Sequence, residues 1–259
     1  MFSLFRSELF QIRKNLAVKI LFLFVIITSV FLGIQEASDS YAAEYKEIGR
    51  DYINYGSGNL LSNMNDYPLA TLLASLLAGW MVSQSFENRT IQEAVSYGKS
   101  RTKIYIVKII MYFVVSIFTC LAMWTAGSIF VFMKNGIGTQ EITGNLCRWD
   151  YLFGMVFAES LAYLSIFAIC GVIAIITKKT SITIGICIIG ITLGFTIITR
   201  ALPESLSCVL NYTPVCLSGQ VLKLDVSWND IIKTSLASIV WIIGISTAGL
   251  LKFQKTELK

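Results

Sequence analysis

The side chains best suited to covalent chemistry are scarce in this chain. Its 259 residues include no histidine, and six of them are cysteine. The lack of histidine excludes histidine-ligated haem, His-based zinc sites and any Ser-His or Cys-His catalytic pair. Gly98-Lys99-Ser100 ends like a phosphate-binding loop, but Glu93 stands where the first glycine of that loop belongs. We therefore assign no catalytic, metal or cofactor-binding residue, and expect that the chain is not an enzyme by itself.

The cysteines divide into two groups by their surroundings. Three lie in apolar runs and are expected to be small core residues: Cys120, Cys170 and Cys187. The others fall in loops that we place outside the membrane. Of these, Cys208 and Cys216 could form a disulfide across a short loop if that compartment is oxidising.

Glu159 is the one acidic residue well inside a predicted membrane span. An ionised carboxylate in hydrocarbon is costly, so this side chain must face protein, face a water-filled cavity or be protonated. One interpretation is that Glu159 lines a substrate path and favours a cationic or amphipathic cargo. The other is that it is a buried packing acid, paired with a hydroxyl such as that of Ser160 or with a neighbouring helix.

The most informative polar stretch is residues 85–104, between the second and third predicted spans. Thr90 and Glu93 have the spacing of a capping box, and Gly98 suits a left-handed helix stop. These signals predict a short cytoplasmic helix over Thr90–Tyr97.

This short helix has a small apolar face and needs a surface to dock on. Ile91, Ala94 and Val95 share one side of it, and a helix of this length is unstable alone in water. The docking surface could be the membrane or a partner protein. Polar side chains surround the apolar residues, which suits a groove on a soluble partner: Asn88, Arg89, Gln92 and Ser96.

The composition indicates which kind of structural element holds these residues in place. The chain is 55% hydrophobic and 14% charged, with a mean hydropathy of +0.67, whereas soluble domains carry about 25% charged residues. Several apolar runs reach the roughly 20 residues that cross about 30 Å of hydrocarbon. They are continuously apolar, which favours helices over a barrel. We expect an all-α integral membrane protein of one domain, with spans at about 16–34, 68–86, 109–133, 152–177, 182–199 and 234–251.

The loops carry a charge bias that predicts the orientation. Seven basic residues fall in predicted outside segments: Lys46, Arg50, Lys134, Arg148, Arg200, Lys223 and Lys233. The other fourteen of the 21 Lys and Arg residues fall in predicted cytoplasmic segments or at the cytoplasmic ends of spans. Both termini are therefore expected in the cytoplasm. Residues 35–67 and 200–233 then lie outside. The net charge of +5 is better explained by this bias and by anionic lipid than by nucleic-acid binding.

The N-terminus and the spans carry two further patterns. Residues 2–14 are predicted to form an amphipathic helix in the cytoplasmic interface; an ordinary basic flank before the first span is the alternative. A cleaved signal peptide ending near 40–42 competes with the first span itself. Small residues recur in span two at Ala70, Ala74 and Ala78, which predicts close packing within one subunit or between subunits.

The stretch after the second span resembles the permease subunit of ABC-2-type ATP-binding cassette transporters. The matching positions are Phe86, Glu87, Thr90, Ile91, Gly98, Arg101 and Lys108. That family often has Gly before the Thr and Pro in the turn, whereas this chain has Arg89 and Tyr97-Gly98. The departures shift the likeness toward small bacterial peptide-export and self-protection members.

The resemblance implies a fold and a set of partners. The family has an N-terminal amphipathic helix, six spans, a coupling helix, and a long outside segment with short helices dipping into the membrane; residues 2–14, 88–97 and 200–233 fill these places. The coupling residues implied are Glu87, Arg89, Thr90, Ile91, Glu93, Ala94, Val95, Gly98 and Arg101.

The assembly that the resemblance implies is an exporter in a bacterial plasma membrane. A separate ATPase subunit in two copies would hold ATP and Mg, and a second permease copy or a sister permease would complete the pore. The cargo implied is an amphipathic or hydrophobic peptide, which would give antimicrobial peptide resistance. Two alternatives remain. One is an ion-coupled carrier or channel, and the presence of only one intramembrane acid and no evident broken span argues against it. The other is a membrane-embedded enzyme or maturation factor.

Overall fold

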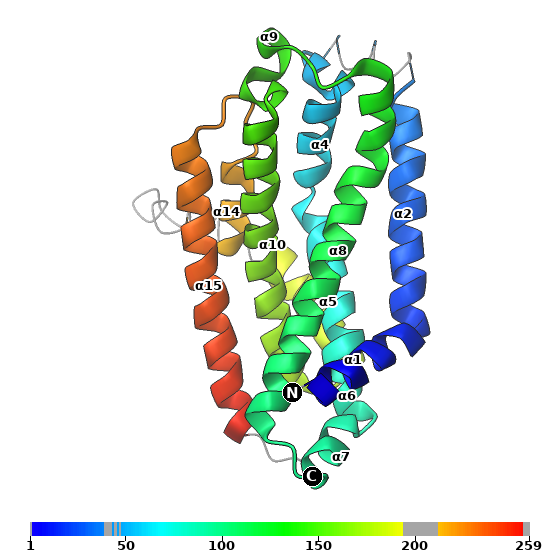
Figure 1. Ribbon diagram of the computed structural model, residues 1–259, viewed down its shortest axis with the longest axis vertical. Coiled ribbons are helices and arrows are strands. Elements are labelled where there is room, and N and C mark those ends of the chain that lie inside the picture. Colours follow the sequence, from blue (N-terminus) through cyan, green and yellow to red (C-terminus); the bar gives the residue numbers. More distant parts are fainter. Residues whose placement is uncertain (1, 39–42, 44–45, 47, 194–211, 256–259) are drawn as a thin grey trace.

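The computed structural model describes residues 2–38, 43, 46, 48–193 and 212–255, and in these residues the regular structure is all helical (Figure 1). This confirms the prediction of an all-α membrane protein. The long helices run side by side along the long axis of the molecule. Two ends can be distinguished in Figure 1: a lower end that carries α1 and α7, and an upper end that carries α9.

Five helices of the described chain are long and apolar enough to cross a bilayer. They are α2 (Leu16–Glu36), the run Tyr67–Glu87, α8 (Arg101–Asn135), α10 (Trp149–Thr177) and α15 (Trp228–Lys255). The second run comprises α5 (Tyr67–Ala78), a π-helical turn η2 (Gly79–Ser83) and α6 (Gln84–Glu87). Each covers a predicted span, and most extend beyond it.

The predicted fifth span is only partly described. It begins as α11 (Thr180–Cys187) and continues as the π-helical segment η4 (Ile188–Leu193). The rest of that span lies outside the described residues, so the count of six stays a prediction.

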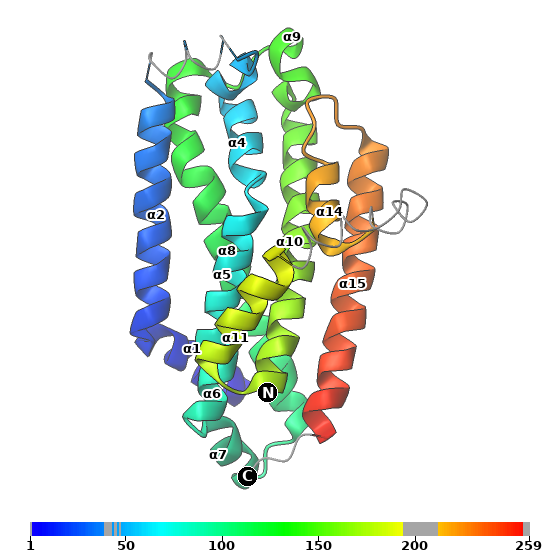
Figure 2. The same ribbon diagram turned by 180° about the vertical axis from the view of Figure 1, so that it is seen from behind.

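The segment 35–67, which we predict to lie on the outer side of the membrane, contains a helix that packs into the bundle. After the 3-10 turn η1 (Asp51–Asn54), the helix α4 (Gly56–Met64) descends beside the upper halves of α8 and α10 (Figures 1 and 2). Sequence reasoning did not predict this helix, because α4 is short and rich in Gly, Ser and Asn, so its hydropathy is that of a loop. Asn63 donates to the hydroxyl of Ser128 on α8 at 3.0 Å, and Tyr163 on α10 donates to the carbonyl of Met64 at 2.7 Å.

The chain breaks between α4 and α5 instead of continuing as one helix. Asn65 ends α4, and the Asp66 side chain caps α5 by accepting a hydrogen bond from the backbone N–H of Leu69 at 3.2 Å. Pro68 lies in the first turn of α5, as predicted. The run Tyr67–Glu87 is itself helical throughout, so the interruption lies just before the predicted second span and not within it.

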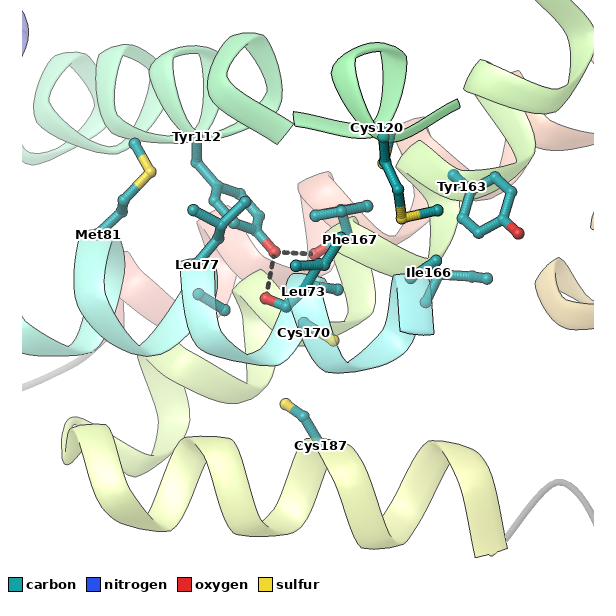
Figure 3. Packing of buried hydrophobic residues seen from close by; sticks show 14 of the residues in the cluster. Leu73, Leu77, Met81, Tyr112, Cys120, Tyr163, Ile166, Phe167, Cys170 and Cys187 are labelled. Carbon is teal, nitrogen blue, oxygen red and sulfur yellow. Dashed lines mark hydrogen bonds between the residues drawn. The ribbon is translucent and has the colours of Figure 1, made fainter. Parts of the chain in front are cut away.

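The core lies where α5, α8, α10 and α11 meet (Figure 3). Tyr112 on α8 is fully buried, and its hydroxyl lies 3.2 Å from the carbonyl of Ala74 and 3.1 Å from that of Phe167. Because a hydroxyl donates one proton, these two carbonyls share one donor. The small residues of span two are all buried here, which supports packing within one subunit.

Two glycines allow α2 to approach α8 closely. A Cβ atom on Gly33 would overlap the backbone of Gly127, and the carbonyl of Met123 accepts a hydrogen bond from Ser29 at 2.5 Å. The rest of α2 is largely exposed, as expected for a helix whose other faces meet lipid.

Short helices close the two ends. At the lower end, α1 (Phe2–Lys14) lies across the bundle, and α7 (Thr90–Ser96) projects below it. At the upper end are α9 (Gln140–Thr143) and the 3-10 turn η3 (Gly144–Cys147). The helix α14 (Pro214–Gln220) packs on α10 and α15.

The segment that contains α14 enters the bundle. Trp241, near the middle of α15, donates to the carbonyl of Tyr212 at 2.6 Å, and Leu217 and Val221 are buried. Part of the predicted outside segment 200–233 therefore packs beside the middle of α15, and the membrane-dipping helices that the resemblance implies stay a prediction.

Candidate functional site

The candidate coupling helix forms where it was predicted, as α7. Its N-terminus follows α6 directly, and it ends before Gly98, whose φ of +76° is the expected left-handed stop. The predicted capping box is wrong. Arg89 occupies the cap position with a φ of +57°, and the hydroxyl of Thr90 donates to the carbonyl of Ser85 at 3.1 Å. The Thr90 hydroxyl therefore ties α7 back to α6.

The apolar face of α7 points into the molecule. Ile91 is 1% exposed, and Ala94 and Val95 pack against the same core cluster. The groove on a soluble partner that we predicted for these residues is therefore not needed, because the chain itself supplies the docking surface. The prediction failed because periodicity shows which face avoids water but not what covers it.

The exposed surface of α7 and its flanking residues is polar. It comprises Glu87, Asn88, Arg89, Glu93, Ser96, Tyr97 and Lys99. Tyr97 is the largest of the uncharged side chains there and is 82% exposed. A partner protein that covered α7 would meet mixed charges and the ring of Tyr97.

Glu87 joins the start of α7 to the start of α11. Its two carboxylate oxygens accept from the backbone N–H of Thr180 at 3.0 Å and from the Thr180 hydroxyl at 2.7 Å. Thr180 is the first residue of α11, so the carboxylate satisfies an N–H group that the helix leaves unpaired and lies at the positive end of the helix dipole. These two hydrogen bonds connect the α6–α7 corner directly to α11.

Lys108 anchors α1 on the bundle next to this corner. Its ammonium group lies 2.9 Å from a carboxylate oxygen of Glu8 and 2.8 Å from the hydroxyl of Ser85, and the two charged side chains are 6% and 17% exposed. A charged group this deeply covered is stable only when it is paired. The Glu8 partner was missed by sequence reasoning, although a single acid in an otherwise basic amphipathic helix was the signal.

Arg101 and its neighbour connect α8 to α15. Arg101 donates to the carbonyl of Gln254 at 3.0 Å, and Gln254 donates to the hydroxyl of Thr102 at 3.1 Å. The ring of Phe86 also packs edge-on against Phe253 of α15, with ring centroids 6.1 Å apart. The predicted coupling residues thus gather at one end, and their flanks contact α1, α8, α11 and α15.

Glu159 lies far from this end, in the upper part of α10. It is 0% exposed, and neither carboxylate oxygen has a hydrogen-bond partner within the described part of the chain. The suggested pairing with Ser160 is wrong, because the Ser160 hydroxyl donates to the carbonyl of Val156 at 2.6 Å. The interpretation of Glu159 as part of a substrate path stays a prediction.

The predicted disulfide and the metal question concern other residues. Cys208 lies outside the described residues, so its pairing with Cys216, which is on α14, stays a prediction. Among the described residues, no group of three or more His, Cys, Asp or Glu side chains is arranged to hold a metal ion.

The fold and its apolar helices define a multi-pass, all-α membrane protein. No family model matches the chain, and no curated protein matches it either.

Proposed function

We propose that the chain is the permease subunit of an ATP-driven exporter in a bacterial plasma membrane, with both termini and α7 in the cytoplasm. The observation that carries the proposal is the lower end of the bundle. There a short helix with a polar outer face is fixed by its own apolar side to the long helices. Such an element is suited to receive force from a soluble motor and pass it inward.

The contacts of α7 indicate how movement would spread. A push on α7 displaces the carboxylate of Glu87, which holds the N-terminus of α11, and the carbonyl of Ser85, which holds Thr90. Ser85 also bonds Lys108, which anchors α1. ATP binding in a separate ATPase would thus rearrange several helices together, while this subunit makes no contribution to the hydrolysis itself.

The partners follow from this arrangement. Two ATPase subunits hold ATP and Mg, one beneath this permease and one beneath a second copy or a sister permease. Membrane lipid surrounds the apolar outer faces of α2 and α15. The cargo is a hydrophobic or amphipathic peptide moving outward, and Glu159 contributes to its path.

The proposal is tested on α7 with the chain purified together with its ATPase. Glu93→Arg and Arg89→Glu reverse charges on the exposed face of α7. We expect each to lower bound ATPase and cargo-stimulated hydrolysis at least tenfold, while membrane insertion and the thermal midpoint are kept. Glu141→Arg, on the exposed surface of α9 at the other end, is the matched control and should change neither. The exporter assignment is lost if no ATPase binds, or if both α7 variants retain full binding.

The break between α4 and α5 favours one other candidate, an ion-coupled carrier, because interrupted helices often form ion sites in such proteins. Purified chain reconstituted into vesicles without an ATPase separates the two. Movement of an amphipathic cationic peptide driven by a proton or sodium gradient alone would favour the carrier over the exporter.

A further inference from the structure

The break between α4 and α5 leaves polar groups where a membrane helix would normally be continuous. Asn65 and Asp66 form this break, and both are exposed, whereas most of α4 above them and the apolar face of α5 below them are buried. An exposed Asn-Asp pair would be unremarkable in a loop, so its depth decides what it means.

The contacts of α4 fix that depth. Near its upper end, the side-chain amide of Asn59 donates to a carboxylate oxygen of Glu36, the last residue of α2, at 2.7 Å. Asp66 lies roughly seven residues further along, which is about 10 Å below Glu36 at a rise of about 1.5 Å per residue. On the other side, the carbonyl of Met64 accepts a hydrogen bond from Tyr163, near the middle of α10. The break therefore lies inside the layer that α2 spans.

Such a break is too costly in free energy to face the hydrocarbon of the lipid directly. Non-helical backbone and ionisable side chains at this depth persist only where protein buries them or where they line a water-filled cavity. Asn65 and Asp66 are exposed, so burial by the described chain is not the explanation.

Polar groups connect the break with the upper end of the bundle. The amide of Asn63 donates to Asn59 at 3.0 Å and to Ser128 at 3.0 Å, and Asn59 in turn contacts Glu36. This chain of side chains ends about one turn above Asp66. The upper end is thus joined to the break by a polar network, of which Asn59 and Ser128 are buried in the protein.

Two carboxyl groups share this layer. Glu159 lies one turn above Tyr163 on α10, and residues four apart share a helix face; that face is the one from which Tyr163 reaches the carbonyl of Met64. Glu159 is fully buried with neither oxygen paired in the described residues. We propose that the break at Asn65–Asp66 is the floor of a water-filled vestibule that opens at the α9 end and admits cationic groups such as ammonium.

The vestibule is independent of the motor at the other end. It rests on the α4–α5 break and its depth, whereas the exporter rests on α7. The two proposals can therefore fail separately.

The test is the accessibility of a thiol placed at the break. Asn65→Cys is made with Asp66 retained and with Cys147, Cys208 and Cys216 replaced by Ser, and sealed vesicles are treated from each side. The probes are two membrane-impermeant methanethiosulfonates, one with a trimethylammonium group and one with a sulfonate. We expect modification only from the α9 side. Relative to a free thiol, the cationic reagent should react roughly tenfold faster than the anionic one, because a carboxylate concentrates cations near it.

Asp66→Asn tests the source of that preference. Added to Asn65→Cys, it should keep the thiol reactive but bring the rate ratio of the two reagents close to that of a free thiol. A ratio that stays tenfold would overturn the assignment of the charge to Asp66.

The lipid-facing control is Phe31→Cys on α2. Phe31 is 59% exposed, and it lies at a depth similar to Asp66 because Gly33 packs on Gly127 while Asn63 bonds Ser128. This thiol should not react with either reagent. If Asn65→Cys fails to reach the membrane, Ser62→Cys on the half-buried surface of α4 gives the same readout. An unreactive thiol at the break, reaction only from the α7 side, or spontaneous cross-linking of two copies through the introduced thiol would each overturn the vestibule.

Discussion

At the scale of single residues, the Glu8–Lys108 pair shows most clearly that a buried charge requires a partner of opposite charge. Lys108 is 5% exposed and lies about two turns inside α8, where an unpaired ammonium group would be costly. The pair also decides where α1 sits, because Glu8 is the contact that ties α1 to α8 through charge.

We predict that Lys108→Met lowers the free energy of unfolding by about 3 kcal/mol, because it leaves Glu8 without its partner in a covered site. Thermal unfolding of the purified protein in detergent measures this. In a double-mutant cycle with Glu8→Gln, the coupling between the two sites should exceed about 1 kcal/mol. The exposed pair Arg148–Asp150, whose side chains are 61% and 44% exposed, is the control, and Arg148→Met should change the stability much less than Lys108→Met. Equal losses at both pairs would contradict the prediction.

Gly98 and Arg89 share the left-handed conformation at the two ends of α7. A Cβ at Gly98 would meet no neighbour within 4 Å in the described part of the chain, so among these residues only backbone strain opposes a side chain there. We predict that Gly98→Ala lowers stability by about 1 kcal/mol. Arg89→Gly should leave stability equal or slightly higher, because it relieves the same strain. The thermal midpoint should fall in Gly98→Ala and should not fall in Arg89→Gly. A loss of stability in Arg89→Gly would show that the arginine side chain makes a stabilising contact.

At the scale of elements, the structure depends on close approaches that a one-dimensional pattern does not reveal. Gly33 and Gly127 were not among the small-residue motifs expected from the sequence, yet they join α2 to α8. By contrast, Gly190 lies four residues before Gly194 in the sequence, a spacing typical of close helix packing, yet a Cβ on Gly190 would meet no atom of the described residues within 4 Å.

Gly33→Ala should therefore destabilise the protein by about 1–3 kcal/mol, because the added Cβ forces α2 away from α8. Gly244→Ala on α15 is the matched control, since a Cβ there has open space, and alanine is the better helix former. Thermal unfolding of the two variants in the same detergent makes the comparison. Equal midpoints would mean that α2 can shift without cost.

At the scale of the whole molecule, orientation is the property that governs every functional statement. The end with α7 faces the cytoplasm in the proposed function, and this follows from the bias of basic residues toward that end.

Cysteine labelling in sealed vesicles checks the orientation. Tyr97→Cys at the tip beyond α7 and Glu141→Cys on α9 are both at positions exposed in the structure. An impermeant maleimide should label the first only from the cytoplasmic side and the second only from the outside. The reverse pattern would invert the bundle and remove the ATPase interpretation of α7, while leaving the helix contacts unchanged.

The sequence by itself determined the class of this protein. Long apolar runs predict membrane helices because backbone groups in hydrocarbon must satisfy one another locally. Local signals also placed α7, since the stop at Gly98 depends only on the backbone freedom of that residue.

Only the tertiary structure decided what each face touches. It turned Ile91 toward the bundle, paired Lys108 with Glu8, and drew α4 between α8 and α10 despite its polar composition. Periodicity and hydropathy report whether a side chain avoids water. They do not report which distant segment covers it, because that depends on packing between residues far apart in the chain.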